Sequence, residues 1–70
     1  SSVPTAQDID NAIDELFAIK PVITVADLRR RLNLSSAYSY RIADRLTKEG
    51  KLRNVGSWHR KVYVKGNGNV

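Results

Sequence analysis

The chain contains no cysteine and no methionine, and only one histidine and one tryptophan occur among its 70 residues. The absence of cysteine excludes disulfide bonds and every zinc site built on thiolates, and the single histidine, His59, does not make a ligand cluster. No apolar run approaches the roughly 18 to 20 residues that a transmembrane helix needs. We therefore expect no metal, no other cofactor and no membrane partner, and the lack of cysteine fits the reducing interior of a cell.

The length of the chain allows one small domain and is too short for a Rossmann domain, a TIM barrel or a two-domain enzyme. With no methionine present, either an initiator methionine was removed before Ser1 or the chain is a piece of a longer protein. We favour the second explanation, because residues 66–69 have the glycine and asparagine composition of a linker. The expected organisation is one domain over residues 1–65 and a flexible tail over residues 66–70.

Basic residues outnumber acidic ones and are unevenly distributed. Lysine and arginine together number 12 against 7 aspartates and glutamates, which gives a net charge of +5. Residues 1–20 carry four acidic side chains and one basic one, whereas residues 21–70 carry eleven basic and three acidic side chains. A basic pole opposite an acidic one orients a polyanion toward one face of a protein. Nucleic acid is the first candidate partner. A membrane surface is the second, and it is less favoured because the sequence has no basic amphipathic helix with a broad apolar face.

Three amphipathic segments predict three helices, because apolar residues recur at helical spacing after a threonine or serine that can cap a helix. Pro21 stops the first segment, Asn33 is suited to the left-handed turn after the second, and Gly50 is a typical stop for the third. The helices are expected over residues 6–20, 25–32 and 36–49, capped by Thr5, by Thr24 and by Ser35 or Ser36.

The remaining segments have the composition of β-strands. Residues 21–23 are short and β-branched, and we expect a small extended segment there. Residues 52–55 and 62–64 are expected to pair as a hairpin around a loop of basic and aromatic residues, 56–61. The predicted fold class is mainly α with a small β-hairpin.

The order of elements (helix, short strand, helix, tight turn, helix, hairpin) resembles the winged helix-turn-helix domain of bacterial and archaeal transcription regulators. The resemblance covers roughly residues 5–65 and is carried by residues 25–35 (VADLRRRLNLS), residues 46–52 (LTKEGKL) and residues 60–64 (RKVYV). Three positions depart from the usual pattern: Arg29 where a small residue is common, Asn33 in place of glycine, and Ser39 in place of an aliphatic residue. The resemblance implies a three-helix winged domain whose third helix enters the major groove, with the wing along the backbone or the minor groove.

In such a domain the first turns of the third helix meet base edges, and the helix before it crosses the phosphate backbone. Arg41 is placed to form a bidentate pair with guanine, the commonest specific contact. The alternatives are that the tyrosines pack on the wing or on a partner, that Arg41 pairs with Asp44, and that the more distant Arg45 is solvated. The candidate DNA-binding residues on the helices are Arg30, Ser36, Tyr38, Tyr40, Arg41 and Arg45.

The hairpin loop supplies the other candidates, namely Trp58, His59, Arg60 and Lys61. Arg60 or Lys61 would contact phosphate or the minor groove, and Trp58 would lie against sugar. The alternatives are that Trp58 folds back onto the domain and that His59 is an ordinary surface residue.

No enzyme is expected, because the chain has no glycine-rich phosphate loop, no nucleophile turn and no facing pair of carboxylates. We expect a sequence-specific double-stranded DNA-binding domain, of a transcriptional regulator or a plasmid or phage DNA-maintenance protein. The partners would be duplex DNA, with a second copy or a larger parent chain, in the cytoplasm at the nucleoid or in a nucleus. The alternatives are a winged-helix protein–protein module and an RNA-binding domain.

Overall fold

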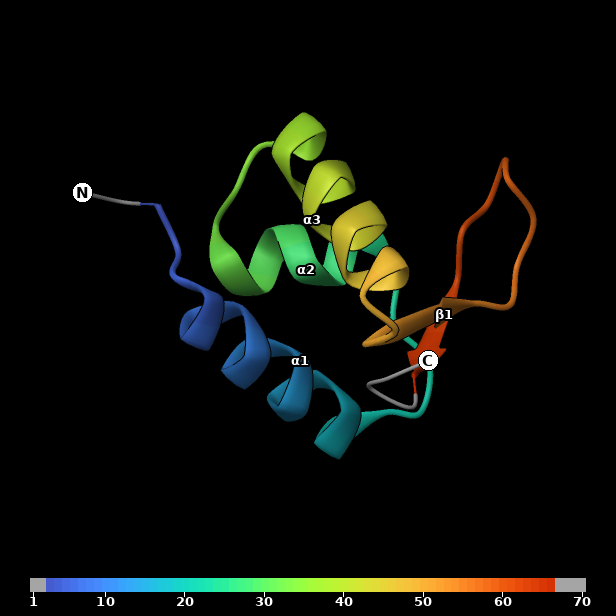
Figure 1. Cartoon of the computed structure of the whole chain (residues 1–70), viewed down its shortest axis with the longest axis horizontal. Helices are drawn as coiled ribbons and strands as arrows, with labels where there is room; N and C mark the ends of the chain where they lie inside the picture. The colour runs from blue at the N-terminus through green and yellow to red at the C-terminus, as the bar shows by residue number, and fades with distance from the viewer. Residues whose placement is uncertain (1–2, 67–70) are drawn as a thin grey trace.

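The computed structural model describes residues 3–66, and its elements follow the predicted order (Figure 1). They are α1 (Ala6–Ile19), α2 (Val25–Leu32), α3 (Ser36–Lys48), β1 (Leu52–Asn54) and β2 (Tyr63–Lys65). The predicted fold class is confirmed: the chain is mainly helical, with three helices and an antiparallel two-stranded hairpin, an arrangement compatible with a small winged-helix fold. Within the described part of the chain, no helix is long and apolar enough to cross a membrane.

The first two helices both begin with a capping box, in which a threonine is followed three residues later by an aspartate. The Thr5 hydroxyl oxygen accepts a hydrogen bond from the Asp8 amide at 3.0 Å, and the Asp8 carboxylate accepts one from the Thr5 amide. Thr24 and Asp27 form the corresponding box at the start of α2. Each box satisfies two backbone N–H groups that the first helical turn leaves without a partner. The two predicted caps are therefore confirmed.

The two turns that bracket α3 use left-handed residues. Asn33, after α2, has a φ of 57°, and the Leu34 amide donates to the Arg29 carbonyl oxygen at 3.0 Å. Gly50, after α3, has a φ of 82°, and the amide of the next residue, Lys51, donates to Leu46 O at 2.9 Å. The left-handed turn at Asn33 and the end of α3 before Gly50 agree with the prediction, and both turns satisfy carbonyl groups at a helix C-terminus. Ser35, not Ser36, caps α3.

The core lies where the three helices meet the hairpin. Its members come from every element and are, in chain order, Ile13, Ile23, Val25, Leu28, Ile42, Ala43, Leu46, Leu52 and Tyr63. Ser39 also lies inside, with none of its surface exposed, and its hydroxyl donates to Ser35 O at 2.8 Å. A small side chain whose polar atom is satisfied lets α3 pack directly on α2, so this departure from the usual pattern leaves no gap between the helices.

The hairpin is tied to the rest of the fold by the segment between α1 and α2. Ile23 and Tyr63 exchange two backbone hydrogen bonds, of 2.9 and 2.8 Å, so the extended segment predicted over residues 21–23 adds an isolated bridge to β2. The strands differ by one residue from the prediction, although the Val55 amide still donates to Val62 O. The Gly66 amide donates to Lys51 O at 2.9 Å, so the pairing reaches the first residue of the predicted tail. The rest of that tail, residues 67–70, lies outside the described residues.

Candidate nucleic-acid interface

Most acidic side chains are paired with bases that hold the helices together. Glu15 of α1 pairs with Arg31 of α2. Asp10, also on α1, accepts a hydrogen bond from Lys51 Nζ at 3.1 Å, which links α1 to the start of the hairpin. These bases are consequently engaged on the side of the molecule where α1 lies.

Asp27 is the most deeply placed of the acids, and it collects two bases at the start of α2. Its carboxylate is 7% exposed and lies 2.9 Å from Lys20 Nζ and 3.1 Å from an Arg30 guanidinium nitrogen. Burial raises the pKa of Asp27, but the Lys20 ammonium and the hydrogen bonds from Thr24 outweigh burial and hold the pKa below its usual value. Arg30, a predicted phosphate contact, is therefore committed in part to this buried carboxylate.

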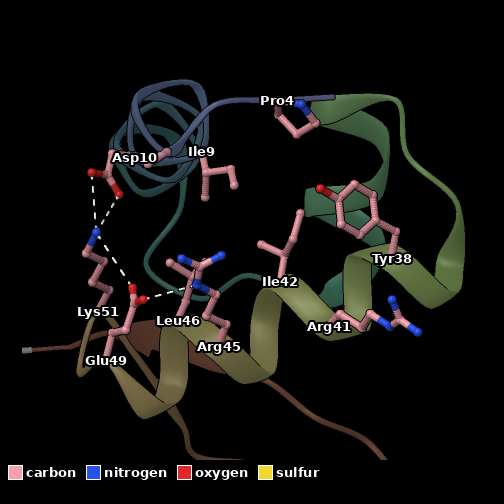
Figure 2. Close-up of a pocket in the computed structure, with 11 residues that line it drawn as sticks. Pro4, Ile9, Asp10, Tyr38, Arg41, Ile42, Arg45, Leu46, Glu49 and Lys51 are labelled. Atoms are coloured by element: carbon pink, nitrogen blue, oxygen red, sulfur yellow. Dashed lines mark hydrogen bonds and ion pairs between the residues drawn. The ribbon is translucent and has the colours of Figure 1, made fainter. Parts of the chain in front are cut away.

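A cleft of about 430 Å³ separates the N-terminal part of α1 from α3 (Figure 2). Ile9 of α1 and Ile42 of α3 line the cleft, and the Tyr38 side chain points into it from α3. At its other end Glu49 bridges Arg45 and Lys51, at 3.2 and 3.8 Å. Tyr38, Arg41 and Arg45 all line this cleft from α3, and the end of the Arg41 side chain extends away from α1 in Figure 2.

The other basic side chains form no ion pair with any residue between 3 and 66. These are Arg29, Arg41, Lys48, Arg53, Arg60 and Lys65. Arg29 and Arg31 are two residues apart on α2, which places them roughly 200° apart around the helix. Because Arg31 is tied to α1, Arg29 lies on the side that faces away from α1.

The exposed face of α3 and the hairpin loop lie next to each other. Lys61 Nζ of the loop is 3.4 Å from Asp44 Oδ1 of α3, and Figure 1 shows the loop beyond α3, on the side opposite α1. Burial raises the pKa of Tyr63, and the nearby charge of Asp44 raises it further, which agrees with this proximity. We call this region the α3–hairpin surface: Tyr40, Arg41, Asp44 and Lys48 of α3 with Trp58, His59, Arg60 and Lys61 of the loop.

The hairpin loop is held by its own hydrogen bonds. The Asn54 side-chain oxygen accepts from the amides of Gly56 and Val62, at 2.9 and 3.2 Å. Ser57 and Arg60 close a turn, because the Ser57 amide donates to Arg60 O and the Arg60 amide donates to Ser57 Oγ, both at 3.1 Å. A Cβ at Gly56 would lie 2.3 Å from Arg60 O, so this close crossing of the loop requires glycine.

Trp58 stands at the tip of this loop and is 77% exposed, so it does not fold back onto the domain. Its ring contacts the His59 ring, with 3.7 Å between centroids and a tilt of 35°. The two rings therefore form an aromatic pair that is exposed to solvent at the tip of the loop.

Five of the predicted site residues are exposed on the α3–hairpin surface, and none of their side chains forms an ion pair with residues 3–66: Tyr40, Arg41, Trp58, His59 and Arg60. The predicted alternative pairing of Arg41 with Asp44 is not formed, because Asp44 holds Lys61 instead. Ser36 is exposed at the first position of α3. The remaining predictions fall on residues with structural partners, namely Arg30, Tyr38, Arg45 and Lys61.

Four unpaired bases were not among the predicted site residues, namely Arg29, Lys48, Arg53 and Lys65. Arg53 alternates with the buried Leu52, so strand periodicity was a signal for its exposure. In the arginine run, Arg30 lies three residues from Asp27, which is a local signal for its pairing, whereas the position of α1 decides that Arg31 is paired and Arg29 is not.

No protein-family model, no curated protein and no solved structure matches this chain. The positions of charged and aromatic side chains on the fold are therefore the observations that indicate a function. Among the described residues, no group of three or more His, Cys, Asp or Glu side chains could hold a metal ion.

Proposed function

We propose that this domain binds double-stranded DNA through the α3–hairpin surface, with α3 in the major groove and the hairpin along the backbone or the minor groove. The observation that carries the proposal is the sorting of basic side chains into two groups. Those on the α1 side are held by carboxylates, whereas Arg41, Lys48 and Arg60 are exposed without an ion pair within residues 3–66. An unpaired arginine or lysine can neutralise a phosphate without first giving up a protein partner.

The proposal assigns different roles to α3 and the loop. Arg41 lies one turn into α3 on its exposed side, within reach of base edges when a helix lies in the major groove. Arg60 lies on the loop, where phosphate or the minor groove is the accessible target. The role is one of binding, without catalysis. If about five to seven phosphates are neutralised, the logarithm of the binding constant should fall with the logarithm of salt concentration with a slope of about −4 to −6.

The experiment compares two arginines of the same helix. Arg41 is unpaired and Arg45 pairs with Glu49, and both side chains are exposed. After selection of a preferred site from a random duplex pool, Arg41→Ala should lose about 1–3 kcal/mol on that site and less on random DNA. Arg45→Ala should change both affinities much less. A flat salt response, or equal losses for the two variants, would contradict the proposal.

A second candidate is a protein–protein module, and the exposure of Trp58 and Tyr40 favours it. Fluorescence anisotropy with labelled duplex DNA and labelled RNA, each across a salt series, distinguishes the candidates. Tight salt-dependent binding of the duplex supports the proposal, stronger binding of RNA shifts the function to RNA, and binding of neither leaves the protein–protein role.

A further inference from the structure

We infer that Trp58 is a stacking platform for an unpaired base, so that the domain prefers duplex DNA that adjoins a single strand over uninterrupted duplex. This inference rests on the proposed function and narrows the class of nucleic acid that the α3–hairpin surface binds. It starts from the tip of the hairpin, where the Trp58 and His59 rings lie together in contact with solvent.

The Trp58 ring is exposed to solvent and is not a displaced core residue. Trp58 is 77% exposed, while the core is complete without it. The turn beneath it is fixed by the hydrogen bonds between Ser57 and Arg60 and by the bonds that Asn54 accepts. A side chain with few rotatable bonds on a fixed turn loses little entropy when a flat partner stacks on it.

The hairpin that carries this tip has only basic charged residues. Residues 50–66 contain no aspartate or glutamate and five lysines and arginines. Arg60, two residues from Trp58, has no ion pair with any described residue. A cationic strand that carries an exposed aromatic ring is the combination that binds single-stranded nucleic acid, because phosphates meet the charges and bases stack on the ring.

His59 lies against the indole, because the two ring centroids are 3.7 Å apart with the ring planes tilted by 35°. The indole is nonetheless open to solvent, since Trp58 is 77% exposed. This exposed surface is free to stack on a base that has no pairing partner, whereas the bases of an uninterrupted duplex present only their edges in the grooves.

The test uses the whole chain and two DNAs with one duplex sequence in common. The first duplex is closed at both ends by hexaethylene glycol linkers, and the second carries a mixed-sequence single-stranded overhang of about ten nucleotides at one open end. Trp58 is the sole tryptophan, so its emission reports on the tip directly. We expect the overhang duplex to quench this emission, the closed duplex to quench it little, and the overhang duplex to bind about 5- to 100-fold more tightly.

The variants separate stacking from other contacts. Trp58→Ala should abolish the preference for the overhang, because it weakens binding of the overhang duplex more than binding of the closed duplex, and Trp58→Phe should retain part of the preference. Gly56→Ala should also reduce the preference, because it disturbs the loop that presents an intact Trp58. Val55→Ala removes another exposed apolar side chain of the same hairpin and should change neither affinity.

Each other outcome has a defined meaning. Equal affinity for the two duplexes, or equal weakening of both by Trp58→Ala, overturns the stacking inference and leaves the proposed function standing. Binding of neither duplex overturns both. A blue shift of Trp58 emission that grows with protein concentration in the absence of DNA would show that the tip contacts another copy of the chain, and would also overturn the inference.

Discussion

Arginine and lysine are used differently on two sides of the molecule. One side is formed by α1 and the start of α2, and the other is formed by α3 and the hairpin. On the first side, Lys20 and Arg31 pair with Asp27 and Glu15 and join α1 to α2, and Arg30 pairs with Asp27 within α2. On the second side Arg41, Lys48 and Arg60 have no such partner within the described range. The net charge alone does not show this difference, because charge that is already paired contributes little to the attraction of a polyanion.

The division also explains why the acids of the first helix matter to the proposed function. Asp10 and Glu15 occupy bases that would otherwise be free on the side of α1. The unpaired bases among residues 3–66 therefore all lie on elements other than α1, which favours the approach of a nucleic acid from another side.

Both sides depend on one core, so its disruption should have the largest effect. Leu46 is buried on the side of α3 that faces the core. Leu46→Ala should lower the free energy of unfolding by about 2–5 kcal/mol, an amount comparable to the whole stability of a small domain. Urea denaturation measures this loss. Ile19→Ala, at a position that is 80% exposed, is the control and should stay within about 0.5 kcal/mol of the parent. A Leu46→Ala variant that unfolds like the parent would mean that α3 does not pack as described.

Removal of the central carboxylate of the paired side should have the next largest effect. Asp27→Asn should lower the free energy of unfolding by about 1–3 kcal/mol at pH 7, because it weakens the cap of α2 and leaves Lys20 and Arg30 without their anion.

The pH dependence of this loss follows from the direction of the pKa shift. Since the pKa of Asp27 is lower in the folded state than in the unfolded state, its contribution is present above about pH 4 and is lost as the pH falls through the folded-state pKa. The stability difference between the parent and Asp27→Asn should therefore shrink in acid. A difference that stays constant from pH 7 down to pH 2 would contradict this assignment.

The smallest expected effect sharpens the comparison within one helix. With α3 in the major groove, α2 would cross the phosphate backbone and bring the unpaired Arg29 to a phosphate, so Arg29→Ala should make the salt dependence of DNA binding shallower by about one. Arg31→Ala should leave that slope nearly unchanged and lower stability by about 0–1 kcal/mol, since it breaks an exposed pair with Glu15. Equal slopes for the two variants would remove the distinction between the paired and the unpaired side of α2.

Local signals in the sequence were sufficient for most of the fold. Thr24 predicted the start of α2, Asn33 predicted the left-handed turn after it and Gly50 predicted the end of α3, because these features depend on residues within one or two helical turns. The spacing of apolar residues likewise predicted three amphipathic helices, and Leu46 is buried on the inner side of the third. The strand ends shifted by one residue, since pairing across the hairpin and the bridge to Ile23 set them.

The sequence by itself determined the helices, their caps, the hairpin and the excess of positive charge, and it also identified the aromatic and basic residues of the loop. Only the tertiary structure decided which of these charges remain available. Lys61 is engaged by Asp44 and Tyr38 is turned toward the cleft beside α1, whereas the pairing of Arg30 with Asp27, three residues apart on α2, follows from local helical spacing. The physical reason is that an ion pair depends on the distance between two side chains in space. Glu15 and Arg31 meet because α1 packs against α2, and no local pattern around either residue contains that information.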